Sequence, residues 1–147
     1  MTTSIPRMSH LGICVTDIGR SMDFYCGALG FVPGEVMEIS SGLDGIMELP
    51  GVSLRSQFIR RTDGFTLELL ELHSPEPFGP RERRPLNQFG LTHLSFYVES
   101  LEASMAELTR CGGTVYAGTL TSIPSFGVRL VYCSDPDGVR VELMQLS

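Results

Sequence analysis

Two histidines and two glutamates recur at fixed spacings in this chain of 147 residues. Glu68 and Glu142 lie 74 residues apart, within the similar segments Asp-Gly-Phe-Thr-Leu-Glu-Leu and Asp-Gly-Val-Arg-Val-Glu-Leu. His10 and His93 lie 83 residues apart, and each is followed by leucine. Imidazole and carboxylate groups are ligands that Zn, Ni, Co and Fe accept, and the carboxylates compensate the charge of the cation. We therefore predict that His10, Glu68, His93 and Glu142 bind one divalent metal ion.

Glu71 is a rival to Glu68, because both lie in the same predicted strand. Three residues separate them, so their side chains point to opposite faces of the strand. The 74-residue spacing pairs Glu68 with Glu142 and leaves Gln145 at the position that corresponds to Glu71. We therefore predict that Glu68 is the ligand and that Glu71 faces solvent or a partner subunit. His73 has no counterpart at either spacing and is left out of the site.

Taken singly, each of the four residues also has a structural interpretation. A histidine in a strand can be satisfied in the core, and a glutamate can face water on the polar side of its strand. The duplication of both residue types in the same order favours a shared site.

The elements that must position these residues form two β-α-β-β-β modules. The first module covers about residues 8–73, with strands at 8–16, 31–37, 52–60 and 65–73. Its helix follows Asp17, an N-cap residue, and ends before Gly30, which adopts the left-handed conformation without penalty. Residues 38–50 are expected to form a loop or irregular edge. Asp63-Gly64 predicts a hairpin turn.

The second module covers about residues 91–146. Its helix begins after Ser100 and ends at Gly112-Gly113, and its later strands are expected at 114–117, 128–133 and 139–146. Residues 74–90 between the modules are rich in proline, which excludes a helix or a central strand and predicts a linker. The whole chain is predicted to be a single α+β domain, residues 1–147.

Composition excludes several classes of partner. The formal net charge is −6, whereas nucleic acids and anionic membranes require a cationic surface. No apolar run approaches the length of a membrane span, and the N-terminus has no signal pattern, so we expect a soluble cytoplasmic protein. None of the four cysteines forms a C-x-x-C pair, and we interpret them as small buried apolar residues.

The ordered set of motifs resembles the vicinal oxygen chelate superfamily, which includes glyoxalase I, methylmalonyl-CoA epimerase, extradiol dioxygenases, fosfomycin-resistance enzymes and bleomycin-binding proteins. The motifs are His10-Leu-Gly-Ile-Cys-Val-Thr-Asp, Ser21-Met-Asp-Phe-Tyr, Gly64-Phe-Thr-Leu-Glu68-Leu-Leu, Gly90-Leu-Thr-His93-Leu-Ser-Phe-Tyr-Val and Asp135-Pro-Asp-Gly-Val-Arg-Val-Glu142-Leu. The resemblance implies two tandem modules whose strands curl into a half-open barrel around a divalent ion (Zn, Ni, Co or Mn). It also implies a homodimer and a small-molecule substrate.

Within the superfamily, resemblance to glyoxalase I and methylmalonyl-CoA epimerase implies a metal-dependent lyase or isomerase. Such an enzyme transfers a proton next to a carbonyl and uses the metal to stabilise an enolate, with Glu142 or Glu68 as the base. Bacterial glyoxalases usually carry an arginine four residues after the first histidine, where this chain has Cys14. Pro50 occupies the place of the epimerases' second acid, and Glu48 is the nearby candidate for that role.

Two alternatives stay open. An extradiol dioxygenase would bind Fe(II) through His10, His93 and Glu142, and Tyr132 lies ten residues before Glu142 as in the dioxygenase signature. That signature also requires a histidine shortly before the tyrosine, and residues 121–126 contain none. A non-catalytic protein that binds a small molecule or antibiotic is the other alternative, although such members usually lack the His/Glu set.

Four arginines could receive an anionic substrate, or three of them could simply belong to a solvated linker. They are Arg55 and the linker residues Arg81, Arg83 and Arg84.

Overall fold

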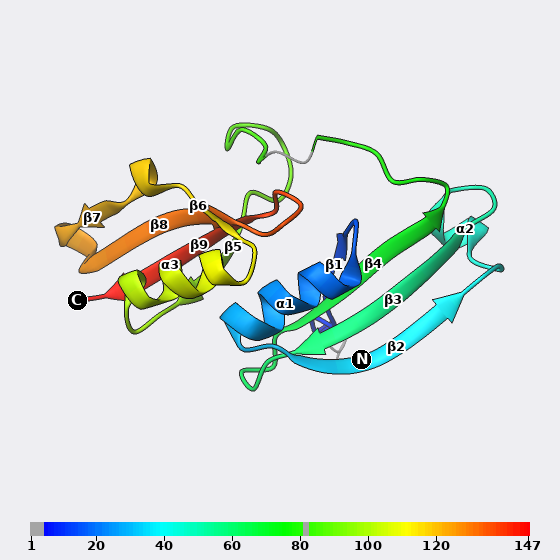
Figure 1. Cartoon of the computed structure of the whole chain (residues 1–147), viewed down its shortest axis with the longest axis horizontal. Helices are drawn as coiled ribbons and strands as arrows, with labels where there is room; N and C mark the ends of the chain where they lie inside the picture. Colours follow the sequence, from blue (N-terminus) through cyan, green and yellow to red (C-terminus); the bar gives the residue numbers. More distant parts are fainter. Residues whose placement is uncertain (1–4, 81–82) are drawn as a thin grey trace. The chain divides into compact units, whose positions relative to one another are not determined.

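A computed structural model describes residues 5–80 and 83–147 of the chain (Figure 1). Its strands form two mixed sheets that repeat one topology. The first sheet has the order β1-β4-β3-β2, and the path of the second is β5-β9-β8-β6, with β7 paired to β8. In each sheet the first strand of the module runs parallel to the last, while the other pairs are antiparallel. The predicted α+β class and the internal repeat are confirmed.

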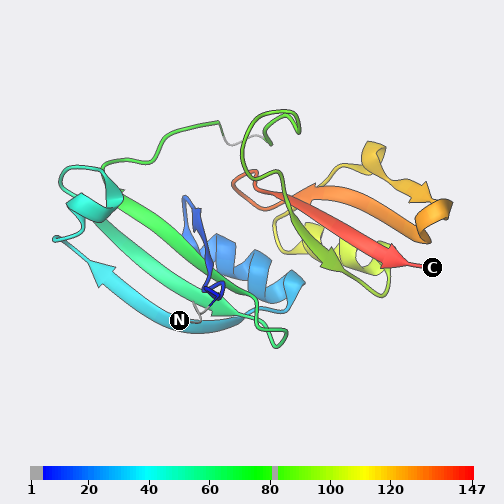
Figure 2. The same ribbon diagram turned by 180° about the vertical axis from the view of Figure 1, so that it is seen from behind.

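The first sheet contains β1 (Leu11–Cys14), β2 (Val32–Ile39), β3 (Ser53–Arg60) and β4 (Thr66–Ser74). Strands β2, β3 and β4 lie side by side as long ribbons in Figure 2. The predicted hairpin turn joins β3 to β4, and Gly64 has φ 89° there, a conformation that favours glycine. Between β2 and β3, where a loop was expected, Asp44–Met47 form the short helix α2.

The second sheet contains β5 (Leu94–Tyr97), β6 (Thr114–Val115), β7 (Thr121–Ile123), β8 (Val128–Ser134) and β9 (Arg140–Leu146). Helix α3 (Leu101–Arg110) contacts β6, β8 and β9. Two short 3-10 helices, Ala117–Thr119 and Pro124–Phe126, flank β7. Strand β7 was not predicted, because its three residues carry too short a pattern to be distinguished from a loop.

Local capping signals set the ends of helix α1 (Ile18–Leu29) as predicted. The Asp17 carboxylate accepts a hydrogen bond from the backbone N–H of Arg20, and Gly30 ends the helix with φ 70°. Ser100 caps α3 in the same way, through a hydrogen bond from the N–H of Ala103.

The chain divides into two compact units whose boundaries differ from the two modules of the sequence. One unit comprises the residues up to Val15 together with Phe31–Pro77, and the other comprises Thr16–Gly30 together with Phe78–Ser147. Helix α1 therefore belongs to the same unit as α3, against which it packs. In the first unit Ile59, Leu67 and Leu69 are fully buried, and in the second Leu101 and Leu143 are. No helix of the described residues is long and apolar enough to cross a membrane.

The cysteines only partly follow their interpretation as buried apolar residues. Cys111 and Cys133 are buried, and burial raises the pKa of Cys133 to about 11. Cys26 is half-buried, whereas Cys14 is exposed, so the expectation was wrong for Cys14. Successive side chains of a strand point to opposite faces, so Cys14 points away from the face of β1 on which Ile13 is buried.

Candidate functional site

The parallel pairing of β1 with β4 brings His10 and Glu68 together in the first unit. Gly12 of β1 is the register partner of Glu68, and His10 lies just before β1. The Nε2 atom of His10 lies 3.2 Å from Oε2 of Glu68. The hydroxyl of Ser56 on β3 donates to Oε1 of Glu68 over 2.6 Å. Both oxygens of this carboxylate therefore have polar neighbours, and the imidazole packs edge-on against Phe58 at 5.2 Å.

The pairing of β5 with β9 builds the same arrangement in the second unit. Nε2 of His93 lies 3.5 Å from Oε2 of Glu142, and the hydroxyl of Ser95 donates to that oxygen over 2.7 Å. The His93 ring packs against Tyr132 at 5.5 Å, as His10 packs against Phe58. Phe58 and Tyr132 are the cross-strand register partners of the two glutamates, so the repeat extends to the aromatic rings.

A hydroxyl group lies within hydrogen-bond distance of the Nδ1 atom of each imidazole. Oγ of Ser9 lies 3.0 Å from Nδ1 of His10, and Oγ1 of Thr92 lies 2.9 Å from Nδ1 of His93. A partner on one ring nitrogen orients the ring and sets which nitrogen presents a lone pair, a common arrangement around metal-binding histidines. In both units Nδ1 is engaged and Nε2 points at the carboxylate.

The distances within each pair suit two ligands of one metal ion. Two donor atoms at about 2.1 Å from a tetrahedral ion stand about 3.4 Å apart. The observed separations of 3.2 Å and 3.5 Å bracket that value. Neither pair is sealed from solvent, since the His10 and His93 side chains are 35% and 27% exposed. Within residues 5–80 and 83–147, His, Cys, Asp and Glu side chains form no group of three or more that could hold a metal. Each unit thus offers one pair of candidate ligands.

Glu71 and His73 lie apart from these pairs. Arg55 is the register partner of Glu71, whereas Phe58 is that of Glu68, so the two glutamates occupy opposite faces of β4. Nε2 of His73 lies 3.4 Å from Oε1 of Glu71. This contact lies on the face of β4 that does not carry Glu68. Glu48 is exposed at the end of α2, where it adopts φ 56°.

Tyr132 and Arg140 surround the second pair. Burial, followed by the charge and hydrogen bond of Glu142, raises the pKa of Tyr132, so its phenol is a hydrogen-bond donor at neutral pH. The guanidinium of Arg140 lies 5.5 Å from the centre of the Tyr132 ring. A cavity of about 500 Å³ adjoins these two side chains. Arg83 and Arg84 also line it, whereas Arg55 pairs with Glu38 in the other unit, and Arg81 lies outside the described residues.

The turn before β9 is fixed by buried hydrogen bonds. The Asp135 carboxylate accepts the backbone N–H groups of Asp137 and Val139 and the hydroxyl of Tyr25. Burial is the main reason that the pKa of Asp135 is raised. Asp137 in turn accepts the N–H and the hydroxyl of Thr16 at the start of α1. These contacts anchor the start of the strand that carries Glu142.

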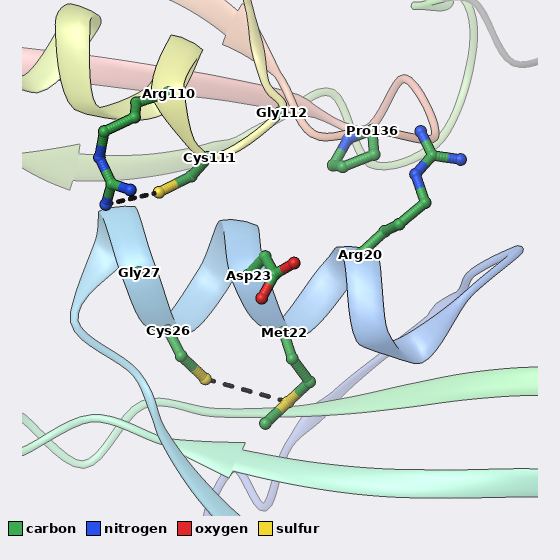
Figure 3. A pocket seen from close by; sticks show the side chains of 9 residues that line it. All are labelled: Arg20, Met22, Asp23, Cys26, Gly27, Arg110, Cys111, Gly112 and Pro136. Carbon is green, nitrogen blue, oxygen red and sulfur yellow. Dashed lines mark hydrogen bonds between the residues drawn. The ribbon is translucent and has the colours of Figure 1, made fainter.

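A second cavity, of about 690 Å³, lies between α1 and α3 and contains none of the predicted ligands (Figure 3). Figure 3 shows Cys26 and Met22 on the side of α1 that faces away from α3. Gly27 lies opposite Cys111, and a Cβ atom there would approach Cys111 Sγ to 2.9 Å, so the glycine permits close packing of the helices. Arg110, which also lines this cavity, forms an ion pair with Glu107.

Sequence reasoning missed the hydroxyl groups of both pairs. Ser9 and Thr92 stand at the 83-residue spacing of the histidines, so their shared chemistry was a readable signal. Ser56 and Ser95 are not equivalent in the repeat, because Ser56 comes from β3 and Ser95 from β5. Only the strand register reveals that both reach a glutamate.

Comparisons with known proteins find a family profile and a relative that each match nearly the whole chain. The profile described as "Glyoxalase/Bleomycin resistance protein/Dioxygenase superfamily" matches residues 7–143. The uncharacterized protein YaeR of Escherichia coli (strain K12) is 29% identical over 143 residues, which cover 96% of this chain and 97% of YaeR. Its name gives no activity.

Solved structures share the fold at lower sequence identity. A glyoxalase family protein from Bacillus cereus superposes with a TM-score of 0.85 at 18% identity, over 99% of this chain and 97% of its own. The fosfomycin resistance protein FosX from Listeria monocytogenes, solved with Mn(II) and sulfate ion, gives a TM-score of 0.59 at 16% identity, over 98% and 95% of the chains. With a profile that covers nearly the whole chain, the protein belongs to the glyoxalase/bleomycin resistance protein/dioxygenase superfamily.

Proposed function

We propose that this protein is a divalent-metal-dependent lyase or isomerase that transfers a proton next to a carbonyl group of a small molecule. The observation that carries the proposal is the repeated pair of one histidine and one glutamate, each with a hydroxyl on the imidazole Nδ1. The proposed ligands are His10, Glu68, His93 and Glu142. The proposed ion is Zn, Ni, Co or Mn.

We propose that both pairs serve one ion, because two ligands are too few for a stable site of these metals. Two carboxylates also match the charge of a divalent cation, and two neutral imidazoles add no charge. FosX, which shares the fold, was solved with Mn(II). The superfamily therefore supports metal-dependent catalysis as a class, and the reaction of this chain is our inference.

The residues of the chain divide the work of such a reaction. A bound divalent cation would supply Lewis acidity that stabilises negative charge on a substrate oxygen. Ser56 and Ser95 hold Glu68 and Glu142 in fixed orientations through hydrogen bonds of 2.6 Å and 2.7 Å. One carboxylate would take the proton next to the carbonyl and return it to the neighbouring position or face. Glu68 and Glu142 are both candidates for this base.

Tyr132 is the observation that favours a ring-cleaving dioxygenase as the second candidate. Its ring packs against His93 and it is the cross-strand register partner of Glu142, as expected of a tyrosine that would touch a substrate bound to Fe(II). That reaction would need a further histidine as acid–base group. The chain has three histidines, and His73 pairs with Glu71 on the opposite face of β4 from Glu68. Proton transfer therefore fits the described residues better.

Exchange of a carbon-bound proton tests the proposed activity. The metal-loaded protein is incubated in D2O with α-hydroxycarbonyl compounds and acyl thioesters, and deuterium uptake next to the carbonyl is followed by NMR. We expect uptake to fall by about 100-fold or more in Glu68→Gln, a typical contribution of a general base. Glu71→Gln is the matched control and should retain full exchange. Oxygen consumption with catechols but no proton exchange would instead support the dioxygenase. A protein that shows neither proton exchange nor oxygen consumption would be a binding protein.

The proposal also includes a homodimer, which the superfamily resemblance implies, and a cytoplasmic location. Sedimentation velocity of the metal-loaded protein should give about twice the chain mass of 16.1 kDa.

A further inference from the structure

The cavity beside the second His–Glu pair has a strongly basic wall. Its lining includes Arg83, Arg84, Arg140 and Tyr132, and no acidic residue of the described chain lines it. Its floor is the face of the second sheet that carries Glu142, because Tyr132 is the register partner of that glutamate. A chain with net charge −6 has thus gathered three arginines next to its candidate metal ligands.

Arg140 is the most informative of the three. It is only 7% exposed, yet its Nη atoms hydrogen-bond to the carbonyl oxygens of Thr92 and Arg84, and its Nε has no partner among the described residues. A buried cation without a counter-charge is costly in free energy. The arginine–carboxylate pairs found in residues 5–80 and 83–147 all use other arginines, such as Arg129 with Glu102. Since no carboxylate of the described residues pairs with Arg140, an anion in the adjoining cavity would supply a counter-charge.

Arg83 and Arg84 are held at the wall by contacts with uncharged groups, and neither forms an ion pair within the described residues. The Arg83 guanidinium stacks on the Tyr116 ring at 3.6 Å, which uses the flat face of the group and not its in-plane N–H donors. Arg84 donates to the carbonyl oxygen of Leu91. Guanidinium groups held in this way can donate hydrogen bonds to the oxygens of a carboxylate, phosphate or phosphonate.

We propose that this cavity is an anion subsite, and that the substrate carries a carboxylate, phosphate or phosphonate in addition to the oxygens that bind the metal. The His93 imidazole and the Arg140 guanidinium each lie 5.5 Å from the centre of the Tyr132 ring. One small molecule can therefore reach both groups within the second unit. The placement of the substrate's other end on the metal rests on the proposed function, whereas the anion subsite itself does not.

The first experiment tests the subsite without metal. Binding of inorganic phosphate to chelator-treated protein is measured by NMR titration, for the wild type and for Arg83→Gln, Arg84→Gln and Arg129→Gln. Since a hydrogen bond to a charged group contributes roughly 1.5–3 kcal/mol, each cavity variant should bind phosphate about tenfold or more weakly. Arg129→Gln removes the same charge elsewhere and should bind as the wild type does. Equal affinities in all four proteins, or an equal loss in the control, would overturn the subsite.

The second experiment tests the link to the metal. Glycolohydroxamate and phosphoglycolohydroxamate present the same two adjacent oxygens to a metal and differ in a distal phosphate. For the Ni-loaded wild type, titration calorimetry should show at least about tenfold tighter binding of the phosphorylated probe, and Arg83→Gln should remove most of that preference without changing metal content. Equal affinity for the two probes would refute the inferred substrate class. Tight phosphate binding by a protein that takes up no metal would refute the proposed function and leave the subsite standing.

Discussion

The hydrogen bond between Tyr25 and Asp135 offers a test of how β9 is held in place. The Tyr25 side chain is fully buried, and its hydroxyl donates to Oδ2 of Asp135 over 2.9 Å. Burial, followed by the charge of Asp135, raises the pKa of Tyr25 well above its ordinary value, so the phenol stays protonated. The hydrogen bond lowers the pKa of Asp135 against the larger opposing effect of burial. Tyr25→Phe removes this one donor and leaves the backbone donors of Asp137 and Val139.

The expected loss follows from the charge of the acceptor. A hydrogen bond to a charged group contributes roughly 1.5–3 kcal/mol, so Tyr25→Phe should lower the free energy of unfolding by about 2 kcal/mol. With a urea m-value of about 2 kcal/mol/M, the unfolding midpoint should fall by about 1 M. Tyr97→Phe makes the same chemical change at a residue that is 71% exposed, and it should leave the midpoint unchanged.

The pH dependence of this loss gives a second, independent check. The hydrogen bond stabilises the ionised form of Asp135. It therefore contributes fully to the free energy of unfolding at a pH where Asp135 is ionised in both the folded and the unfolded protein. It is lost as the pH falls through the pKa of Asp135 in the folded protein. The difference between wild type and Tyr25→Phe should therefore be largest near pH 7 and shrink towards pH 3. A Tyr25→Phe protein as stable as the wild type at pH 7, or a difference that grows on acidification, would refute this account of the turn.

Three further predictions concern ligand orientation, thiol reactivity and acid stability. Thr92→Val removes the hydroxyl from Nδ1 of His93 and should weaken binding of Ni or Zn about 10–100-fold by calorimetry. Alkylation at pH 8 followed by mass spectrometry should label the exposed Cys14 first, whereas Cys133, with its pKa raised to about 11 by burial, should react only after unfolding. The Arg129 hydrogen bond lowers the pKa of Glu102. This pair therefore stabilises the fold at pH values above the ordinary pKa of glutamate, and its contribution is lost as the pH falls through the pKa of Glu102 in the folded protein. Glu102→Gln should therefore lower the thermal midpoint slightly at pH 7, and this difference should shrink on acidification.

Local signals in the sequence predicted the elements whose ends depend on neighbouring residues. Asp17 and Gly30 define α1 through contacts within a few residues, and Asp63-Gly64 defines the β3–β4 turn in the same way. The short elements α2 and β7 escaped prediction. Three paired residues in β7 depend on β8 for their hydrogen bonds, and such pairing leaves no periodic trace in so short a segment.

The internal repeat allowed a prediction that no single motif allowed, because its spacing favours Glu68 over Glu71 as the candidate ligand. The structure places Glu68 beside His10 and Glu71 beside His73. The grouping of α1 with the second unit could not be predicted, because it arises from packing between segments distant in the chain. The buried Arg140 was missed for a similar reason, since its surroundings come from the linker and from β8.

Metal stoichiometry tests the central claim most directly. Protein purified without chelator is dialysed against Ni, Co, Zn or Mn, and bound metal is measured by elemental analysis for the wild type, Glu68→Gln, Glu142→Gln and the control Glu71→Gln. If both His–Glu pairs serve one ion, the wild type and Glu71→Gln should hold one metal ion per chain. Each of the other variants should lose at least about 100-fold in affinity, more than the loss of an outer-shell contact. Two ions per chain, or full binding by Glu68→Gln, would contradict a shared site, and no uptake of any of these metals would contradict a metalloenzyme.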